Sequence, residues 1–226
     1  MGANGDGRRR PPPPSAAVSV RVGTTTDAAA AAGLHAGQIS EGFLSRLGPR
    51  FLTRLYRRIT TSPNSFLLIA EDAGTTVGFI AGSTDVSALY RTFLWRDGVA
   101  AAILAGPQLI TRWRQVVETL RHGTSGGTGA GRGAELLAVA VDRDRRNRGA
   151  GWELVTSFLA EVSSRGETAA HVVVGADNER AVTIYRRAGF EAVERFELHS
   201  GTTSLLMQWD RLDPPPDPSP AEAARP

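Results

Sequence analysis

The stretch 135–154 constrains the fold of this chain more than any other part of the sequence. The apolar run 135–141 predicts a strand, and a polar loop that contains four arginines follows it. Gly149 and Gly151 then open an amphipathic helix. Free backbone N–H groups at a helix start can hold an anion, and glycines leave no Cβ atoms in the way. The pattern predicts either an anion-binding turn or an ordinary helix start whose glycines permit close packing.

Apolar periodicity along the rest of the chain predicts alternating strands and helices. Strands are expected at 18–22, 65–71, 75–84, 170–175, 191–198 and 203–209, and helices at 27–39, 43–59, 149–164 and 178–188. Asp72-Ala73-Gly74 is a hairpin signal between two of the strands, and Asp27 is expected to cap the first helix. This order favours one mixed α/β sheet with helices on both faces.

The stretch 85–133 interrupts this alternation and is expected to be a helical insertion with a glycine-rich return. Residues 99–103 and 109–120 have helical patterns, and glycine recurs from 123 to 133. Residues 86–122 hold five arginines against two acidic residues, a local charge of +3. Four interpretations stay open: an extension of the core, a lid over an acceptor, a dimer contact, or a surface for anionic or lipid-like acceptors. The lid is preferred, because the insertion directly precedes the strand at 135–141.

Prolines cluster at both ends of the 226-residue chain. Four stand at 11–14 and six between 214 and 226, so 1–16 and 213–226 are expected to be disordered tails around one domain at 17–212. The longest apolar stretch is too short for a membrane span, and polyproline stands where a signal peptide needs an apolar segment. We therefore expect a cytoplasmic protein without a membrane span.

Composition narrows the chemistry. The chain has no cysteine, which excludes disulfides, thiolate metal sites and cysteine nucleophiles. Its four histidines lack metal-ligand spacing and are expected at the surface or as strand positions, so no metal is expected. All 26 basic residues are arginine without a clustered stripe, and the net charge is only +3, so no nucleic-acid partner is expected. Residues 123–127 match the serine-hydrolase motif G-x-S-x-G, but Ser125 does not lead from a strand into a helix.

Two motifs in the right order resemble the Gcn5-related N-acetyltransferase (GNAT) family. Arg146-x-x-Gly149-x-Gly151 is similar to the family's acyl-CoA pyrophosphate loop, and Asn178-x-x-Ala181-x-x-x-Tyr185-x-x-x-Gly189-Phe190 is similar to its second signature. The close resemblance covers 135–193, and 135–142 look most similar to the ribosomal-protein N-terminal acetyltransferase branch. It implies a mixed, mostly antiparallel sheet flanked by helices, here with the insertion between the third and fourth strands.

The resemblance also implies which residues hold the cofactor, acetyl-CoA. The backbone amides expected at the pyrophosphate are those of Arg146, Asn147, Arg148, Gly149, Ala150 and Gly151. The edge of the strand that carries Val139 and Val141 pairs with the pantetheine arm, and the N–H of Val139 polarises the thioester carbonyl. Asn178 hydrogen-bonds near the pantetheine.

Two further residues receive catalytic roles from the resemblance. Tyr185 lies about two helical turns after Asn178, so its phenol can protonate the departing thiolate. The alternative is a half-buried aromatic residue whose hydroxyl is satisfied. Glu135 stands where several members of the family carry a carboxylate proposed as general base, and it is equally compatible with a solvated charge at a strand end.

The function implied is an acetyl-CoA-dependent N-acetyltransferase. A primary amine on a small molecule or a protein attacks the thioester directly within a ternary complex. The alternative is a non-catalytic acyl-CoA-binding or regulatory module on the same fold. Association with a membrane surface and a homodimer both remain open, and a family fold does not specify the acceptor.

Overall fold

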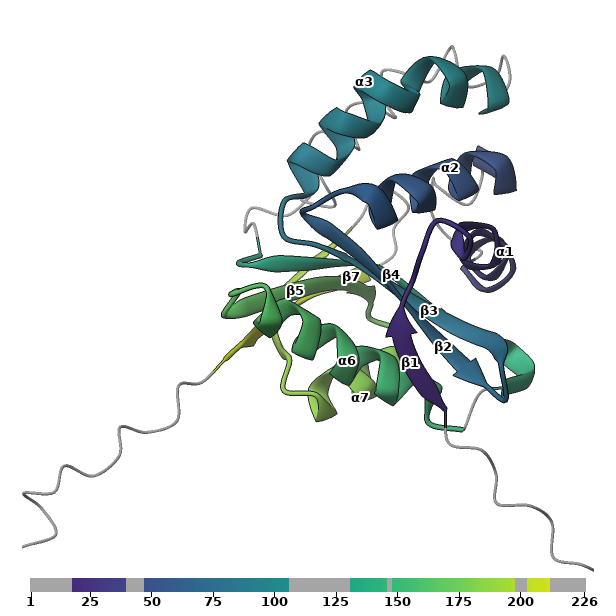
Figure 1. The fold of residues 1–226 in the computed structure, drawn as a ribbon. Coiled ribbons are helices and arrows are strands. Elements are labelled where there is room, and N and C mark those ends of the chain that lie inside the picture. Colours follow the sequence, from purple (N-terminus) through teal and green to yellow (C-terminus); the bar gives the residue numbers. More distant parts are fainter. Residues whose placement is uncertain (1–17, 40–46, 106–130, 146–147, 198–202, 212–226) are drawn as a thin grey trace, which may run out of the picture.

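The computed structural model describes residues 18–39, 47–105, 131–145, 148–197 and 203–211, with the backbone alone at 97–105. A seven-stranded sheet in the order β1-β2-β3-β4-β5-β7-β6 crosses the molecule (Figure 1). Its strands are β1 (Ser19–Val22), β2 (Ser65–Asp72), β3 (Thr75–Ser83), β4 (Ala134–Val141), β5 (Ala169–Gly175), β6 (Glu191–Glu197) and β7 (Thr203–Asp210). β4 and β5 run parallel, and the other neighbouring pairs are antiparallel. The expected fold class is confirmed.

Helices cover both faces of the sheet (Figure 1). The helices on one face are α1 (Ala28–Gln38), α2 (Gly48–Thr61) and α3 (Val86–Ala105), and those on the other are α6 (Ala150–Ser164) and α7 (Glu179–Arg187). α2 shows why: Phe51, Leu55 and Ile59 recur at spacings of four and are all buried. Full burial of each such side chain stabilises the fold by about 1.5–3 kcal/mol.

The apolar core is divided into two clusters by the sheet. The first lies under α1, α2 and α3 and receives Phe79 from β3 and Ala140 from β4. The second lies under α6 and α7 and receives Leu136 from β4 and Val172 from β5. Because side chains alternate along a strand, the neighbouring residues Val139 and Ala140 of β4 belong to different clusters. This alternation decides which face each candidate site residue occupies.

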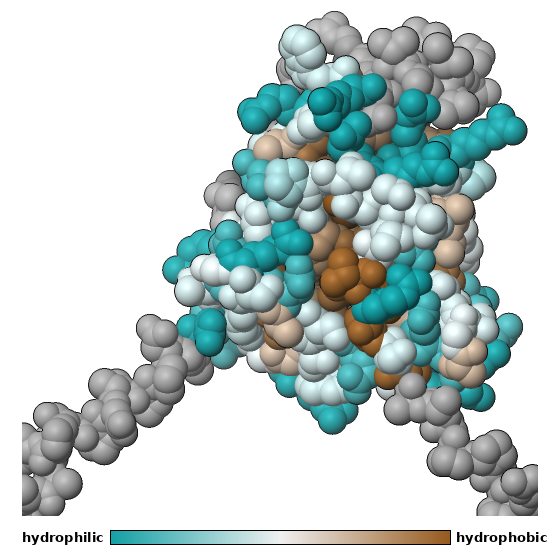
Figure 2. Space-filling model, in the orientation of Figure 1, coloured by the Kyte–Doolittle hydropathy of each residue, from teal (hydrophilic) through white to brown (hydrophobic). Residues whose placement is uncertain are grey.

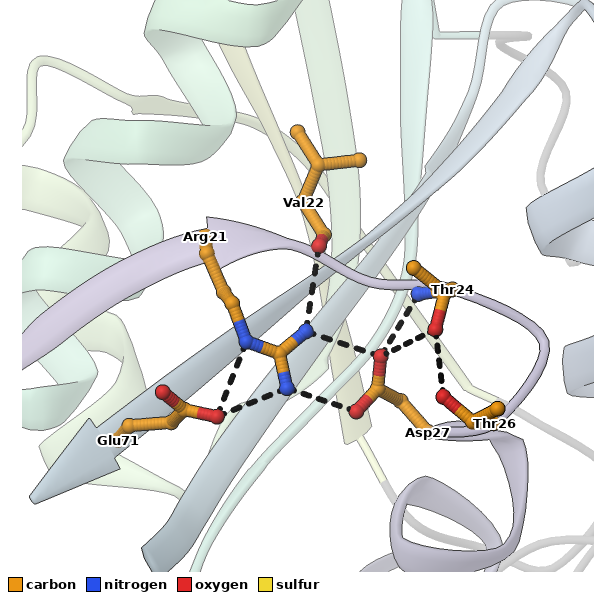
Figure 3. Close-up of polar contacts among 6 residues, drawn as sticks. All are labelled: Arg21, Val22, Thr24, Thr26, Asp27 and Glu71. Carbon is orange, nitrogen blue, oxygen red and sulfur yellow. Dashed lines mark hydrogen bonds and ion pairs between the residues drawn. The ribbon is translucent and has the colours of Figure 1, made fainter. Parts of the chain in front are cut away.

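An ion-pair network fixes the entry from β1 into α1 (Figure 3). Arg21 donates to both carboxylate oxygens of Asp27, at 2.8 and 2.9 Å, and to Glu71 at 2.9 Å. Asp27 also accepts the Thr24 N–H at 2.7 Å, and these hydrogen bonds, chiefly those from Arg21, hold the pKa of Asp27 well below its usual range. Asp27 occupies the N-cap position, but its side chain bonds to no helix N–H. The expected side-chain cap is therefore wrong, because Arg21 and Thr24 engage that carboxylate instead.

The insertion begins with a helix that is longer than the sequence pattern predicts. α3 starts at Val86, whereas helical patterning was recognised only from residue 99. The side chain of Asp85 accepts the Ala88 N–H at 2.8 Å and caps the helix, and Leu89 and Phe93 are fully buried in the first core cluster. This part of the insertion extends the core. The helix expected at 109–120 and both tails lie outside the described residues.

The surface is mostly polar, with a few exposed apolar side chains. Figure 2 shows apolar residues gathered near the centre of one face, with hydrophilic residues around them. Trp95 on α3 is 87% exposed, and Val22 and Val193 are also exposed. Within the described part of the chain, no helix combines the length and apolarity needed to cross a membrane.

Candidate functional site

A gap opens between β4 and β5, in the middle of the sheet. The two strands pair only at Ala134–Ala170 and Glu135–His171. From there β4 stays paired with β3 up to Val141, while β5 stays paired with β7 up to Gly175. The two parallel strands therefore separate toward their carboxyl ends and leave facing edges unpaired.

The register of β4 determines which backbone groups face that gap. Asp142 donates its N–H to the carbonyl of Val77 at 2.8 Å, just beyond the last paired residues of β3 and β4. Hydrogen-bonded and non-hydrogen-bonded pairs alternate in an antiparallel ladder, so Ala140 bonds to β3 as Asp142 does. The N–H groups of Val139 and Val141 accordingly point away from β3, toward the gap. Earlier in β4 there is a β-bulge at Leu137, because Leu136 and Ala138 pair with consecutive residues of β3.

The start of α6 borders the carboxyl end of β4. Gly149 adopts a φ of +85°, a left-handed conformation that favours glycine. Apart from its chain neighbours, none of the described residues has an atom within 4 Å of where its Cβ would stand. A Cβ at Gly151 would lie 3.2 Å from Ile184 of α7, so this glycine permits close helix packing. Gly149 thus fits the expected anion-binding turn, and Gly151 fits the expected close packing. Ala150 is buried, and Arg146 and Asn147 lie outside the described residues.

A buried carboxylate supports the same loop. Asp72, the last residue of β2, is 5% exposed, and its Oδ2 accepts from Arg145 at 2.9 Å and from Arg148 at 2.8 Å. Two charge-assisted bonds to one anchor restrict the loop that leads into α6. From sequence, Asp72 is predictable only as a hairpin residue, because it lies 73 positions from Arg145.

α7 positions the two residues of the second motif. The side-chain oxygen of Asn178 accepts the Ala181 N–H at 3.2 Å and caps the helix. Tyr185 is buried in the second core cluster with its ring 5.6 Å from that of Phe190, and burial raises the pKa of its phenol. The structure gives the Tyr185 hydroxyl no hydrogen-bond partner among the residues that it describes. Both expectations for Tyr185 stay predictions.

Trp152 lies between α6 and α7. The guanidinium of Arg187 stacks over its ring at 4.2 Å from the centroid. This contact joins the first turn of α6 to the last turn of α7, next to the glycine pair. Trp152 is half-buried.

The opposite face of the sheet carries a different group of side chains. Ala134 and Leu136 belong to the cluster under α6, so Glu135 between them points toward α1, α2 and α3. By the same alternation His171 of β5 points there too, and its Nε2 lies 3.7 Å from Oε2 of Glu135. Tyr90 of α3 approaches from the insertion, and burial together with the charge of Glu135 raises the pKa of Tyr90.

The expectation for the histidines was wrong for His35. This residue of α1 is 4% exposed, its Nδ1 lies 2.7 Å from the hydroxyl of Tyr56, and burial lowers its pKa to about 4. His171 is a strand residue, as expected, but its contact with Glu135 could not be deduced from spacing. Among the described residues no group of three histidine or acidic side chains is placed to hold a metal ion.

The arrangement combines three chemical capacities around the β4–β5 gap. Free N–H groups on β4 and at the start of α6 can bind carbonyl and phosphate oxygens. A buried phenol faces one side of the sheet, and a carboxylate with an imidazole faces the other. Such a site suits the transfer of an acyl group from a phosphate-containing carrier to a nucleophile that arrives from the opposite face.

Comparisons with known proteins agree with this geometry. The model of the acetyltransferase (GNAT) family matches residues 38–190. An uncharacterised N-acetyltransferase of Methanocaldococcus jannaschii is 36% identical over 61 residues, and this alignment spans 27% of either chain. The match therefore covers about a quarter of that relative's length.

Solved structures share the fold along almost their whole length. A GCN5-related N-acetyltransferase from Kribbella flavida superimposes with a TM-score of 0.58 at 17% identity, over 86% of this chain and 98% of that one. The yncA protein of Salmonella typhimurium, solved with its cofactor acetyl-CoA, gives 0.57 at 14% identity over 89% and 99%. The ribosomal-protein-S18-alanine N-acetyltransferase of Escherichia coli gives 0.56 at 14% identity over 88% and 97%.

Proposed function

Because the chain belongs to the GNAT family of acetyltransferases, we propose that it transfers an acetyl group from acetyl-CoA to a primary amine by direct attack within a ternary complex. The observation that carries the proposal is the β4–β5 gap, with the N–H groups of Val139 and Val141 directed into it. The yncA protein, which has the same fold, was solved with acetyl-CoA as its cofactor.

The residues around the gap fit acetyl-CoA. Backbone amides from 146 to 151 hold the pyrophosphate, since the start of α6 carries a partial positive charge. The open space at Gly149 leaves room for phosphate oxygens. The free edge of β4 pairs with the amide groups of the pantetheine arm, and the side-chain amide of Asn178 contributes beside it. Asp72 keeps the loop in place through Arg145 and Arg148.

The chemical step uses groups from both faces of the sheet. The N–H of Val139 donates to the thioester oxygen and stabilises the negative charge that develops as the amine attacks the carbonyl carbon. The C–S bond then breaks, and Tyr185 gives its phenolic proton to the thiolate. Burial keeps this phenol protonated at neutral pH.

The amine approaches from the face that carries Glu135. An ammonium group must lose a proton before it attacks, and the Glu135 carboxylate lies where it can promote that loss. Tyr90 beside Glu135 brings the insertion into the acceptor site. We propose one acyltransferase domain at 17–212, in which the insertion at 85–133 contributes to acceptor binding.

An acceptor screen tests this function. The wild-type protein is mixed with acetyl-CoA and with a panel of small amines, amino acids and peptides, and released thiol and acetylated product are both quantified. We expect equal amounts of thiol and product with at least one amine, and intersecting initial-velocity lines. Coenzyme A binding without turnover of any amine would identify a non-catalytic acyl-CoA-binding module. Parallel lines would contradict direct attack.

A further inference from the structure

His171 is held in one orientation by contacts around its ring. Its Nδ1 lies 3.3 Å from the backbone carbonyl of Arg132. A Cβ at Gly131 would overlap the imidazole, so the backbone there packs directly against the ring. The side chain of Gln208 in turn bonds to both the N–H and the carbonyl of Arg132, at 3.0 and 3.2 Å. The histidine ring is thus positioned by backbone that β7 itself holds in place.

This orientation assigns the proton on the neutral ring. A carbonyl oxygen can only accept, so Nδ1 donates to Arg132 and carries the proton. Nε2 then has a free lone pair, and it is the nitrogen 3.7 Å from Oε2 of Glu135. A lone pair and a carboxylate that converge at this distance are two acceptor groups. The pair is therefore suited to a group that brings protons, such as an ammonium ion.

We propose that His171 is the general base of the reaction, with Glu135 as its partner; this inference rests on the proposed N-acetyltransferase function. An N–H bond of the acceptor ammonium breaks, and the proton forms a bond to Nε2. The resulting imidazolium lies beside the Glu135 carboxylate, which stabilises its charge. The neutral amine uses its lone pair on the thioester carbon, and His171 later returns the proton to solvent.

Basicity favours the imidazole over the carboxylate as the base, and burial favours proton transfer to either group. Imidazole is more basic than a carboxylate by about two pKa units in model peptides, so it accepts a proton from ammonium at a smaller cost. The side chains of His171 and Glu135 are also only 13% and 14% exposed, which limits competition from water. Ionisable groups of the described residues on this side include Tyr90 from α3, beside Glu135, and the ion pair of Arg132 with Asp210.

The test is His171→Asn, because the asparagine amide still donates to the Arg132 carbonyl while the base at Nε2 is lost. Acceptor kcat/KM is measured at saturating acetyl-CoA from pH 5.5 to 9.5, with the amine identified in the screen. We expect a loss of about 100-fold near pH 7 that shrinks as the acceptor deprotonates by itself. Affinity for coenzyme A and thermal unfolding are expected to match those of the wild type.

A matched acceptor separates base chemistry from positioning. A β,β,β-trifluorinated analogue of the same amine is already largely neutral at pH 7, so the variant is expected to acetylate it at nearly the wild-type rate. An equal loss with both acceptors, or a loss that is independent of pH, would overturn the proposal in favour of a positioning role. Wild-type activity at every pH would remove His171 from the mechanism. If the wild-type protein itself acetylates no amine, the proposed function fails and the base proposal fails with it.

Discussion

The two faces of the sheet at the β4–β5 gap are built in different ways. The residues assigned to the acyl donor that the structure describes come from two short segments under α6 and α7, 148–151 and 178–185, and from the free edge of β4. The face under α1, α2 and α3 carries Glu135, His171 and Tyr90, which come from β4, β5 and the insertion. Glu135 and His171 meet only because the strands pair in one register. Donor recognition is thus encoded locally, and acceptor chemistry is encoded through the sheet.

Substitutions on the two faces are expected to affect different steps of the reaction. A local motif at a helix start keeps its geometry when the rest of the chain changes, because the backbone amides that bind phosphate belong to the motif itself. The acceptor face depends on helices that precede β4 in the chain, including an insertion that brings Tyr90 to Glu135. We therefore expect substitutions on the donor face to affect acetyl-CoA binding or thiolate release, and substitutions on the acceptor face to change the pH dependence.

The largest effect is expected for Gly149→Asp. A carboxylate at the start of α6 would repel the pyrophosphate, and we expect calorimetric titration to detect no coenzyme A binding. Gly166→Asp is the matched control, since Gly166 has a φ of +83° and lies at the other end of the same helix. Like Gly149, it has no atom of the other described residues within 4 Å of its Cβ position, its chain neighbours apart. Equal affinity in the two variants would exclude this loop as the phosphate site.

Tyr185→Phe is expected to lower turnover by about 100- to 10,000-fold while coenzyme A affinity changes little. The substitution keeps the buried ring and removes only the proton donor. Tyr56→Phe is the control from the other core cluster, where the hydroxyl contacts His35, and it is expected to retain activity. Rapid-quench measurement of the chemical step decides the outcome, because wild-type turnover in the Tyr185 variant would assign thiolate protonation to another group.

Glu135→Gln is expected to reduce acceptor kcat/KM by up to about 100-fold, with the deficit largest at low pH. The amide keeps the size of the side chain but no longer stabilises a neighbouring positive charge. A pH–rate profile at saturating acetyl-CoA checks this. A deficit that stays constant across the pH range would indicate acceptor positioning instead, and an unchanged profile would place Glu135 outside the mechanism.

A smaller effect is expected for Asp72→Asn, which weakens the anchor of Arg145 and Arg148. We expect the KM for acetyl-CoA to rise by about tenfold, which corresponds to about 1.4 kcal/mol, while kcat is kept. Glu71→Gln is the matched control, because Glu71 is the adjacent residue and pairs with Arg21, not with the loop. If both variants shift KM equally, the anchor has no specific role.

His35 is expected to make the stability of the fold depend on pH without taking part in the reaction. Burial lowers its pKa to about 4, below that of the unfolded chain, so unfolding takes up a proton between about pH 6.5 and 4. The free energy of unfolding is therefore expected to fall by about 3 kcal/mol as pH drops through that range. Denaturant titrations of wild type and His35→Gln at several pH values test this. An equal pH dependence in both would show that other groups cause the loss.

Sequence patterns located the helices and strands of the donor face better than the side-chain contacts of the acceptor face. The strand, the glycine pair and the α7 motif each consist of neighbouring residues, so their arrangement followed from helix and strand geometry alone. Asp72 and His171 were missed as site residues because their partners lie 73 and 36 positions away, and no local pattern gives a sheet register. The start of α3 was missed because its buried residues, Leu89 and Phe93, form too short a stripe beside a charged stretch.

Amide hydrogen exchange with and without coenzyme A tests the central claim most directly, namely that the donor occupies the β4–β5 gap. We expect coenzyme A to slow exchange in 137–141 of β4, where the free N–H groups face the gap, and in 148–151 at the start of α6. Exchange in β1 and β2 is expected to stay unchanged. Protection confined to α1, α2 or β6, or binding without any protection of β4, would contradict the account.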